Sequence, residues 1–361
     1  MRGDEWVVAL DIGGSGSRLV ARRLVLDAAR AVVPGPGQDD VAITGRPVAV
    51  TPDGSDAAAV VAELVVRLRA AAPHVTAVRA AAVGATGLAS LVRDPAELHR
   101  ALRSGLADGE RRGPPTAVAA DALTAHLGAL GGRPGAVVAV GTGAIALGTD
   151  LETVWHRVDG WGHLLGDLGS GSWIGAQSLR AAVAAHDGRD NGGSTALLAA
   201  ATERFGPVPT WPGGLYTRPD RAQVLASFAP DVTAAAQAGD PVSRQVLAGA
   251  GTHLATTLAA ALVDGVPPLA AATGGVLAIG PLLTGAFRAR LAVLRPDVEL
   301  VPAAGTPLDG ALLLAGRLAT DPAAVVGHEP WLTLGGPAGP APSDPTAPDP
   351  TTHVPTTHEE D

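Results

Sequence analysis

The chain contains the same short unit twice, and this repetition limits its possible folds more than any other feature. The apolar run Trp6–Leu10 ends at Asp11 and a cluster of small residues, and the alternating segment Arg18–Leu26 follows as a second strand. Further along, Ala136–Val140 ends in a Gly-Thr-Gly turn, and Ala144–Gly148 continues as an antiparallel strand. An apolar run that ends in glycines is typical of a buried strand entering a tight turn. Two such hairpins predict two related lobes.

Strand and helix patterns alternate along the rest of the chain, which indicates an α/β protein. Apolar runs predict further strands over Val48–Thr51, Val78–Val83, Thr116–Ala120, Val276–Ile279 and Val298–Val301. Apolar residues at helical spacing predict helices over Ser55–Ala72, Pro95–Leu106, Ala122–Leu130, Ala176–Ala185, Ser194–Phe205, Arg221–Ala238, Pro241–Leu262, Leu282–Leu294 and Leu308–Leu318.

The length predicts two domains at about 150 residues each. We place one lobe at 1–120 and the other at 121–330, with a last helix near 308–320 that can pack back on the first lobe. From 335 to 361 the chain is rich in Pro, Thr and Asp and has almost no large apolar residues, which predicts a disordered tail.

The composition excludes several classes of function. All 26 basic side chains are arginine, which excludes the lysine-dependent P-loop NTPases, protein kinases and Schiff-base enzymes. The chain has no cysteine, so thiolate nucleophiles, iron–sulfur clusters and cysteine-bound zinc are excluded. The formal net charge of -9 argues against nucleic acid or an anionic membrane as the main partner. With neither a signal-peptide pattern nor an unbroken apolar run of about 20 residues, we expect a cytoplasmic protein.

Both glycine turns have the composition of a phosphate site. In the first turn, small residues let backbone N–H groups approach phosphate oxygens, and the hydroxyls of Ser15 and Ser17 add donors. Asp11 can hold Mg²⁺ through water, because Mg²⁺ dehydrates reluctantly. The second turn, Gly141-Thr142-Gly143, lets two lobes clamp one polyphosphate without any lysine. A plain β-hairpin turn is the alternative interpretation of each sequence.

Three further positions complete the candidate chemistry. Asp121 follows a predicted strand, where it can act as a general base or as the N-cap of the next helix. In the glycine-rich stretch Asp159–Gly175, the indole of Trp161 and the carboxylate of Asp167 suit the apolar face and the hydroxyls of a sugar, although both tryptophans of the stretch can also be core residues. His163 there fits a structural histidine better than a catalyst. Gly274-Gly275 leaves room for a flat ligand such as adenine, or is an ordinary loop.

In this order, the five stretches resemble the sugar kinase/Hsp70/actin ATPase superfamily. More narrowly, the chain is similar to the BadF/BadG/BcrA/BcrD ATPase family and, within it, to the N-acetylglucosamine kinases, over about Val7–Leu318. The run GWGHLLGD, followed by GS and WIG, is the most specific element. The resemblance implies two ribonuclease-H-like lobes in the actin-like ATPase fold, with ATP and Mg²⁺ in the cleft between them.

The resemblance also implies a role for each motif residue. Asp11 is expected near Mg²⁺, and Asp121 is expected to be the base. The expected ATP contacts are Gly13, Gly14, Ser15, Ser17, Gly141, Thr142, Gly143, Gly274 and Gly275. The expected sugar contacts are Gln38, Gly160, Trp161, Asp167 and Gly171. The implied reaction is ATP-dependent phosphorylation of a hydroxyl, O6 being the expected one, of N-acetylglucosamine or a related amino sugar, and related kinases are often homodimers.

Three positions depart from the family pattern. Ala144 replaces the usual serine after the second turn, Leu168 replaces the glutamate of GDEGS, and Gln38 stands where an asparagine that contacts the sugar is expected. These changes bear on the identity of the sugar more than on the reaction. They also keep a second function open, a non-catalytic sensor of sugar or nucleotide on the same fold. A third, the ATPase activator of a reductase, needs cysteines for a shared cluster, and this chain has none.

Overall fold

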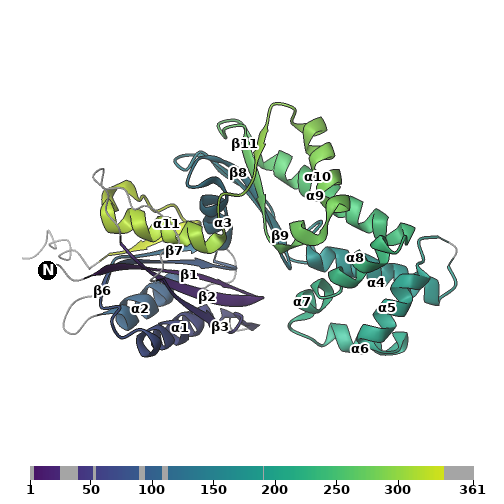
Figure 1. The fold of residues 1–361 in the computed structure, drawn as a ribbon, viewed down its shortest axis with the longest axis horizontal. Helices are drawn as coiled ribbons and strands as arrows, with labels where there is room; N and C mark the ends of the chain where they lie inside the picture. Colours follow the sequence, from purple (N-terminus) through teal and green to yellow (C-terminus); the bar gives the residue numbers. More distant parts are fainter. Residues whose placement is uncertain are drawn as a thin grey trace, which may run out of the picture.

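The computed structural model describes residues 4–24, 40–51, 54–88, 94–107, 113–189 and 191–336. Two lobes lie side by side in Figure 1, and each is built on its own β-sheet. The segment predicted as a tail falls almost entirely outside the described residues, and so does Gln38. Within the described ranges, no helix is long and apolar enough to cross a membrane.

The first lobe is a mixed sheet covered on both faces. Its strands lie in the order β13-β7-β6-β1-β2-β3. They are β1 (Glu5–Gly13), β2 (Gly16–Arg23), β3 (Val41–Gly45), β6 (Ala77–Ala85), β7 (Thr116–Ala120) and β13 (Leu332–Gly335). The helices α1 (Ala57–Ala71) and α2 (Pro95–Leu106) cover one face, and α11 (Pro307–Thr320) covers the other (Figure 1).

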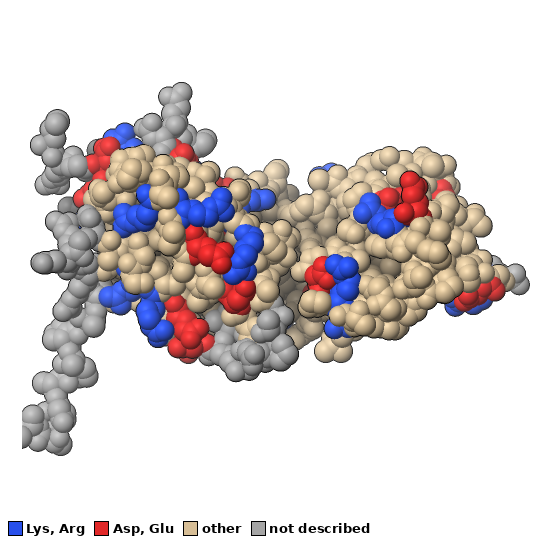
Figure 2. All heavy atoms as spheres, turned by 90° about the horizontal axis from the view of Figure 1, so that it is seen from below, with Lys and Arg blue, Asp and Glu red and all other residues tan. Residues whose placement is uncertain are grey.

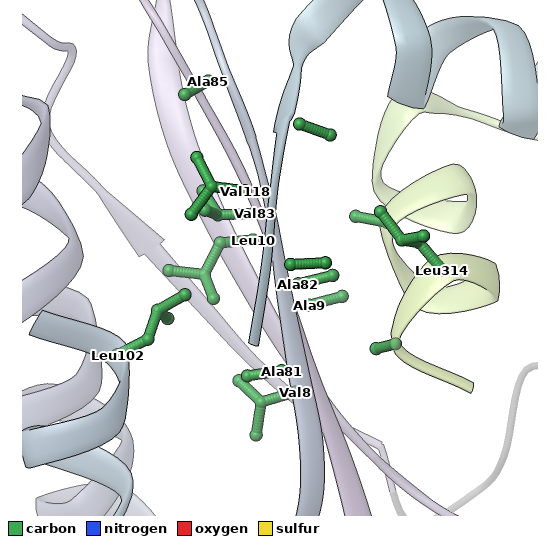
Figure 3. Packing of buried hydrophobic residues seen from close by; sticks show 14 of the residues in the cluster. Val8, Ala9, Leu10, Ala81, Ala82, Val83, Ala85, Leu102, Val118 and Leu314 are labelled. Atoms are coloured by element: carbon green, nitrogen blue, oxygen red, sulfur yellow. The ribbon is translucent and has the colours of Figure 1, made fainter. Parts of the chain in front are cut away.

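Burial on both faces explains why β1 is apolar without alternation. Val8, Ala9 and Leu10 are fully buried. Figure 3 shows Leu102 of α2 on one side of this sheet and Leu314 of α11 on the other. Because the alanine side chains of β1 and β6 are small, α11 can lie close to the sheet, and it contacts both strands.

The second lobe has a five-stranded sheet and most of the helices. Its strands lie in the order β10-β9-β8-β11-β12. They are β8 (Gly135–Val140), β9 (Ala144–Thr149), β10 (Trp155–Asp159), β11 (Leu269–Thr273) and β12 (Glu299–Val301). The longer helices are α3 (Asp121–Leu130), α4 (Gly171–His186), α5 (Thr195–Phe205), α9 (Pro241–Ala261) and α10 (Pro281–Leu294), and three shorter ones are α6 (Trp211–Tyr216), α7 (Arg221–Ala226) and α8 (Ala229–Gln237).

Helices α3 and α11 pack against each other between the two sheets (Figure 1). The chain passes from the first sheet to the second through α3, and it returns through α11. After α11, strand β13 pairs antiparallel with β7, with Leu332 opposite Ala119. The first and the last strand of the described chain therefore belong to one sheet, with β7 and β6 between them.

Several sequence-based boundaries were wrong. Val276–Ile279 is not a strand: the strand is β11, and the chain then leaves the sheet at Gly274 and forms a 3₁₀ turn, Gly275–Ile279. The single helix predicted over Arg221–Ala238 is two helices, α7 and α8, because Pro230 starts a new helix and cannot donate a hydrogen bond inside an old one. The third strand of the first sheet is β3 and not Val48–Thr51, of which only Val50–Thr51 forms a short strand. Strands β10, β11 and β13 were not predicted.

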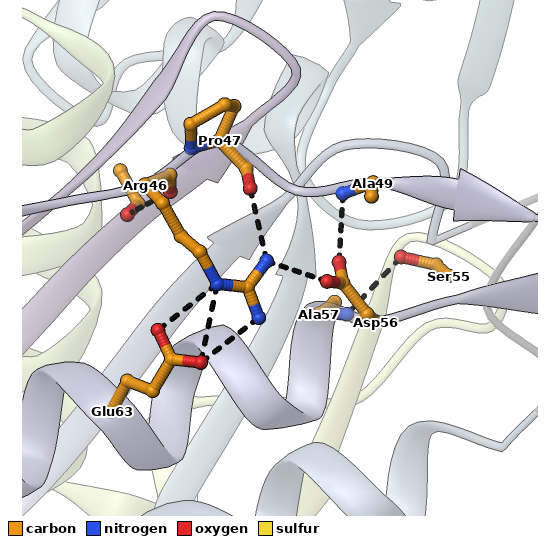
Figure 4. A network of polar contacts seen from close by, with 8 residues as sticks. Arg46, Pro47, Ala49, Ser55, Asp56, Ala57 and Glu63 are labelled. Atoms are coloured by element: carbon orange, nitrogen blue, oxygen red, sulfur yellow. Dashed lines mark hydrogen bonds and ion pairs between the residues drawn. The ribbon is translucent and has the colours of Figure 1, made fainter. Parts of the chain in front are cut away.

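Surface charges pair locally on the face shown in Figure 2, where arginines lie beside carboxylates. Arg46 is an example: its guanidinium bonds both Glu63 and Asp56, and Asp56 also accepts from the Ala49 amide (Figure 4). This network ties the segment after β3 to the start of α1. Exposed pairs of this kind contribute about 0–1 kcal/mol each, so they position chain segments more than they stabilise the fold.

Candidate active site

A cleft of about 740 Å³ lies between the lobes and collects most of the residues that the sequence singled out. Both glycine turns line it, as do the end of β7 and the glycine-rich loop after β10. The predicted site residues found in its lining are Asp11, Gly13, Gly14, Ser15, Asp121, Gly141, Thr142, Gly143, Gly160, Trp161, Asp167, Gly274 and Gly275. The grouping follows from topology, because β1, β6 and β7 are parallel and end at one edge of their sheet.

Asp121 is the first residue of α3 and faces the cleft. Its Oδ2 accepts a hydrogen bond of 2.5 Å from Oγ1 of Thr86, and its Oδ1 accepts one of 2.8 Å from the Ala122 amide. Burial raises the pKa of Asp121, and these two hydrogen bonds and the charge of Arg157 oppose the rise. The carboxylate is therefore held in one orientation. Each oxygen still has a free lone pair, so Asp121 can accept a proton.

Asp11 lies in the same cleft, on β1 next to the first glycine turn. Burial and then the charge of Asp121 raise its pKa to about 6, while Arg18 lowers it. A buried carboxylate whose ionisation is opposed by a second carboxylate suits a site that receives a cation. Within the described ranges no three acidic or histidine side chains cluster into a metal cage. A single carboxylate fits Mg²⁺, which usually keeps waters and binds substrate phosphates as well.

The second glycine turn is fixed by amides from outside it. Gly171 N donates to Gly141 O at 2.9 Å, and Ser172 N donates to Thr142 O at 3.1 Å. Both donors belong to the first turn of α4, whose N-cap is Ser170. Gly171, predicted to contact the sugar, therefore lies behind the turn and outside the cleft lining. The N-terminus of a long helix behind a glycine turn favours an anion in front of it.

Asp167 joins the glycine-rich loop to the second turn. Its carboxylate accepts hydrogen bonds from the backbone of Ala144 and Gly162, which lower its pKa, but burial has the larger effect and raises it. A Cβ atom at Gly143 would lie 2.8 Å from Oδ2 of Asp167, so only glycine leaves room for the carboxylate there. The side chain of Ala144 is buried, and the backbone amide of this residue makes the contact with Asp167.

Trp161 has an exposed indole at the cleft wall, with 63% of its surface accessible. The guanidinium of Arg157 lies over this ring, 4.1 Å from its centroid. Arg157 Nε also donates to the Asp159 carbonyl at 2.9 Å, and a terminal nitrogen donates to the Gly160 carbonyl. An arginine held in this way fixes the orientation of the ring and leaves its other face for a ligand.

Gly274 lies where β11 ends beside β8. Its φ is 112°, and a Cβ atom there would lie 2.0 Å from the Val140 carbonyl oxygen. A larger residue is thus excluded on both grounds. The glycine pair follows the strand β11 and does not precede a strand over Val276–Ile279, which was predicted there. Both glycines nevertheless line the cleft.

Sequence reasoning missed some cleft residues and misplaced others. Thr86 and Arg157 line the cleft without having been assigned a role. Thr86 ends a third small-residue sequence, Gly-Ala-Thr at the end of β6, which was a usable signal. Ser17 is buried outside the cleft lining, where its Oγ donates to the Arg46 carbonyl at 2.7 Å. His163 is not in the lining either, and burial lowers its pKa.

The sequence also matches a known protein family. The sequence model of the BadF/BadG/BcrA/BcrD ATPase family matches residues 10–314. The chain belongs to that family. The match includes both glycine turns, Asp121, the glycine-rich loop and the Gly274 pair. It ends inside α11, so β13 and Trp331, which also lines the cleft, lie beyond it.

Two curated relatives of this family member are sugar kinases by name. The N-acetylmuramic acid/N-acetylglucosamine kinase of Clostridium acetobutylicum is 28% identical over 202 residues, which are 54% of this chain and 65% of the relative. The N-acetyl-D-glucosamine kinase of Dictyostelium discoideum is 35% identical over 125 residues, which are 33% of this chain and 38% of the relative. The aligned parts thus span less than two thirds of each relative.

Solved structures share the fold over a greater length. A Chromobacterium violaceum protein described as a candidate N-acetylglucosamine kinase has a TM-score of 0.61 and 26% identity, covering 86% of this chain and 98% of that one. A similarly described Porphyromonas gingivalis protein has a TM-score of 0.59 and 16% identity, covering 87% of this chain and 99% of that one. These alignments confirm the predicted actin-like fold of two lobes.

Proposed function

We propose that the protein is an ATP-dependent sugar kinase that phosphorylates a hydroxyl, O6, of N-acetylglucosamine or a related amino sugar. The observation that carries the proposal is the placement of Asp121. It lies in the cleft that both glycine turns line, with its carboxylate held by Thr86. The names of the two curated relatives support the choice of an amino sugar. Because the reaction consumes ATP, we place the enzyme in the cytoplasm.

In the proposed reaction, ATP lies with its phosphates between the two glycine turns and its adenine near Gly274 and Gly275. The acceptor sugar lies against Trp161, with hydroxyls on Asp167 and on the backbone of Gly160. Asp11 holds Mg²⁺, which neutralises charge on the phosphates when bound. Positioning and electrostatic stabilisation supply most of the catalysis in phosphoryl transfer, so small residues and fixed amides are suitable parts.

Asp121 then acts as the general base. The acceptor oxygen attacks the γ-phosphorus in line, the O–P bond forms, and the bond to the bridging oxygen of ADP breaks. The hydroxyl proton passes to the Asp121 carboxylate, whose second oxygen is still held by the backbone or by Thr86. The products are a sugar phosphate and ADP.

The non-catalytic sensor remains the second candidate, because Ala144 lacks the usual hydroxyl and Leu168 lacks the usual carboxylate. The contacts of Ala144 favour the kinase. Its backbone amide bonds Asp167, and an alanine provides that amide as well as a serine does. Asp11, Asp121 and Asp167, the three carboxylates that the proposed reaction uses, all line the cleft.

The test is a coupled assay of ADP release with ATP, Mg²⁺ and a panel of sugars: N-acetylglucosamine, glucosamine, N-acetylmannosamine, N-acetylmuramic acid and glucose. We expect turnover with at least one amino sugar. Asp121→Asn should reduce kcat at least about a thousandfold while sugar binding, measured by calorimetry, persists. Asp94→Asn is the matched control, because Asp94 also binds a backbone amide at the start of a helix, α2, and does not line the cleft. ATP binding without sugar-stimulated ADP release from the wild type would favour the sensor.

A further inference from the structure

Asp159, the last residue of β10, does not line the cleft but lies behind the glycine-rich loop. Its side chain is buried. Oδ1 accepts a hydrogen bond of 2.7 Å from the Asp167 amide, and Oδ2 accepts one of 2.9 Å from the Leu168 amide. The glycine-rich loop connects β10 to α4, and this carboxylate joins its beginning to Asp167 and Leu168 near its end. Hydrogen bonds to a charged acceptor are about twice as strong as neutral ones.

The loop backbone is shaped around this carboxylate. Asp159 has a φ of 63° and Asp167 a φ of 57°, and both values are uncommon for residues other than glycine. A Cβ atom at Gly166 would lie 2.2 Å from Oδ1 of Asp159, so the carboxylate fills the interior of the loop. Arg157 fixes the main chain at the same point by donating to the Asp159 carbonyl at 2.9 Å.

These contacts continue to the cleft. Asp159 holds the backbone of Asp167, and the Asp167 carboxylate in turn bonds the amides of Ala144 and Gly162. We propose that Asp159 is a positioning residue that fixes Asp167 for the acceptor sugar. The proposal rests on the function proposed above, because it assumes that Asp167 meets the sugar. It adds a determinant of sugar affinity that touches neither substrate.

Two substitutions separate the carboxylate from the backbone conformation. Asp159→Gly keeps a residue that adopts positive φ without cost but removes both acceptor oxygens. Asp159→Asn keeps the shape and one acceptor, and turns an NH₂ group toward a backbone N–H. A matched control is Asp150→Asn, since the Asp150 carboxylate also accepts backbone amides, those of Glu152, Thr153 and Val154, and lies outside the cleft lining.

Steady-state kinetics of the purified full chain, with N-acetylglucosamine and ATP varied separately, give the first measurement. We expect Asp159→Gly to raise the KM for the sugar about ten- to a hundredfold, with the KM for ATP changed less than about threefold, because buried N–H groups lose their partners near the sugar only. Asp159→Asn should show a smaller rise, and Asp150→Asn should leave both KM values unchanged. A wild-type KM for the sugar in Asp159→Gly would overturn the proposal.

Amide hydrogen exchange gives a second measurement that needs no activity. We expect the amides of Asp167 and Leu168 to exchange slowly in the wild type and at least about tenfold faster in Asp159→Gly, whereas Asp150→Asn leaves them unchanged. Unchanged exchange in Asp159→Gly contradicts the proposal. If the wild type phosphorylates no sugar but the exchange rates respond, the proposed function fails while the positioning of Asp167 by Asp159 stands.

Discussion

The two glycine turns each join a pair of antiparallel strands, yet they are supported differently. The first, between β1 and β2, is a hairpin turn in which Gly13 pairs with Gly16. Inside its own lobe the Val48 amide donates to the Gly13 carbonyl at 3.0 Å, and from the other lobe Nε2 of Gln223 on α7 donates to the Gly14 carbonyl at 3.2 Å. The second turn is held inside its own lobe by the amides of Gly171 and Ser172 and is covered by the Asp167 carboxylate.

This difference indicates how the two turns function. The second turn is pre-organised, because every group that holds it belongs to the same lobe and stays with it. The first turn also accepts a hydrogen bond from Gln223 of the opposite lobe, so part of its support depends on how the lobes sit relative to each other. Pre-organised groups cost nothing to reorient during reaction, so the second turn should carry more of the phosphate binding.

The largest predicted effect comes from the same substitution, glycine to alanine, made in each of the two turns. Gly143→Ala places a Cβ atom 2.8 Å from Oδ2 of Asp167, which is fixed by amides and cannot withdraw. Gly14→Ala places one 2.9 Å from Nε2 of Gln223, the end of a flexible side chain that can move. We expect kcat/KM for the sugar to fall at least about a hundredfold in the first variant and less than about tenfold in the second.

Gly285→Ala is the control for that pair, because Gly285 lies on α10 outside the cleft lining and a Cβ atom there meets nothing within 4 Å. Kinetics and thermal unfolding of the three variants should be measured together, so that a loss of folded protein is not counted as a loss of activity. Equal losses in Gly143→Ala and Gly14→Ala would show that the two turns are equivalent and that the bracing of the second has no consequence.

A second prediction concerns stability and compares Asp11, beside the first turn, with Asp150, in the turn between β9 and β10. The pKa of Asp11 is raised to about 6, so the folded protein binds this proton more tightly than the unfolded chain does. Its contribution to stability is therefore present below about pH 4 and is lost as the pH rises through about 6. In the absence of Mg²⁺, Asp11→Asn should raise the free energy of unfolding at pH 7 by up to about 3 kcal/mol.

The contribution of Asp150 to stability has the opposite pH dependence. Hydrogen bonds from Val154, Glu152 and Thr153 lower its pKa, so its contribution is present at neutral pH and is lost in acid. Asp150→Asn should therefore destabilise the protein at pH 7. Urea unfolding at pH 4 and pH 7 measures both variants. At pH 4 Asp11 is largely protonated in the folded state, so Asp11→Asn should then give little gain in the free energy of unfolding. A gain that persists at pH 4 would contradict the link between the pKa of Asp11 and stability.

The sequence predicted the parts of the site that are local in the chain. Each glycine turn follows its strand directly, so composition and spacing were sufficient to find Asp11 and Gly141. The hydrogen bond from Thr86 to Asp121 joins residues 35 positions apart and depends on the pairing of β6 with β7. Asp159 was included in the glycine-rich stretch but not interpreted, because its importance depends on a left-handed backbone that no local pattern specifies.

The fold was predictable to a similar degree. The long amphipathic helices were found nearly complete, whereas β13 was not predicted, and all but its last residue lie between the predicted second lobe and the predicted tail. Its four residues, Leu-Thr-Leu-Gly, form a strand by pairing with β7. His99 reinforces the pair by bonding both Thr116 of β7 and Thr333 of β13, at 2.7 and 2.9 Å. Such a strand owes its existence to a partner more than 200 residues away, so it leaves little trace in its own sequence.

The smallest predicted effect tests the support of the first turn alone. Gln223→Ala removes the side-chain amide that reaches Gly14 from the opposite lobe. A single neutral hydrogen bond contributes about 0.5–1.5 kcal/mol, so we expect the KM for ATP to rise about two- to tenfold. The melting temperature should hardly change, because α7 keeps its packing against α4. Gln237→Ala, the same change at an exposed position of α8, should leave both quantities unaltered. A rise in the KM for the sugar with an unchanged KM for ATP would indicate that Gln223 acts on the acceptor side, and that the first turn needs no support from the other lobe to bind ATP.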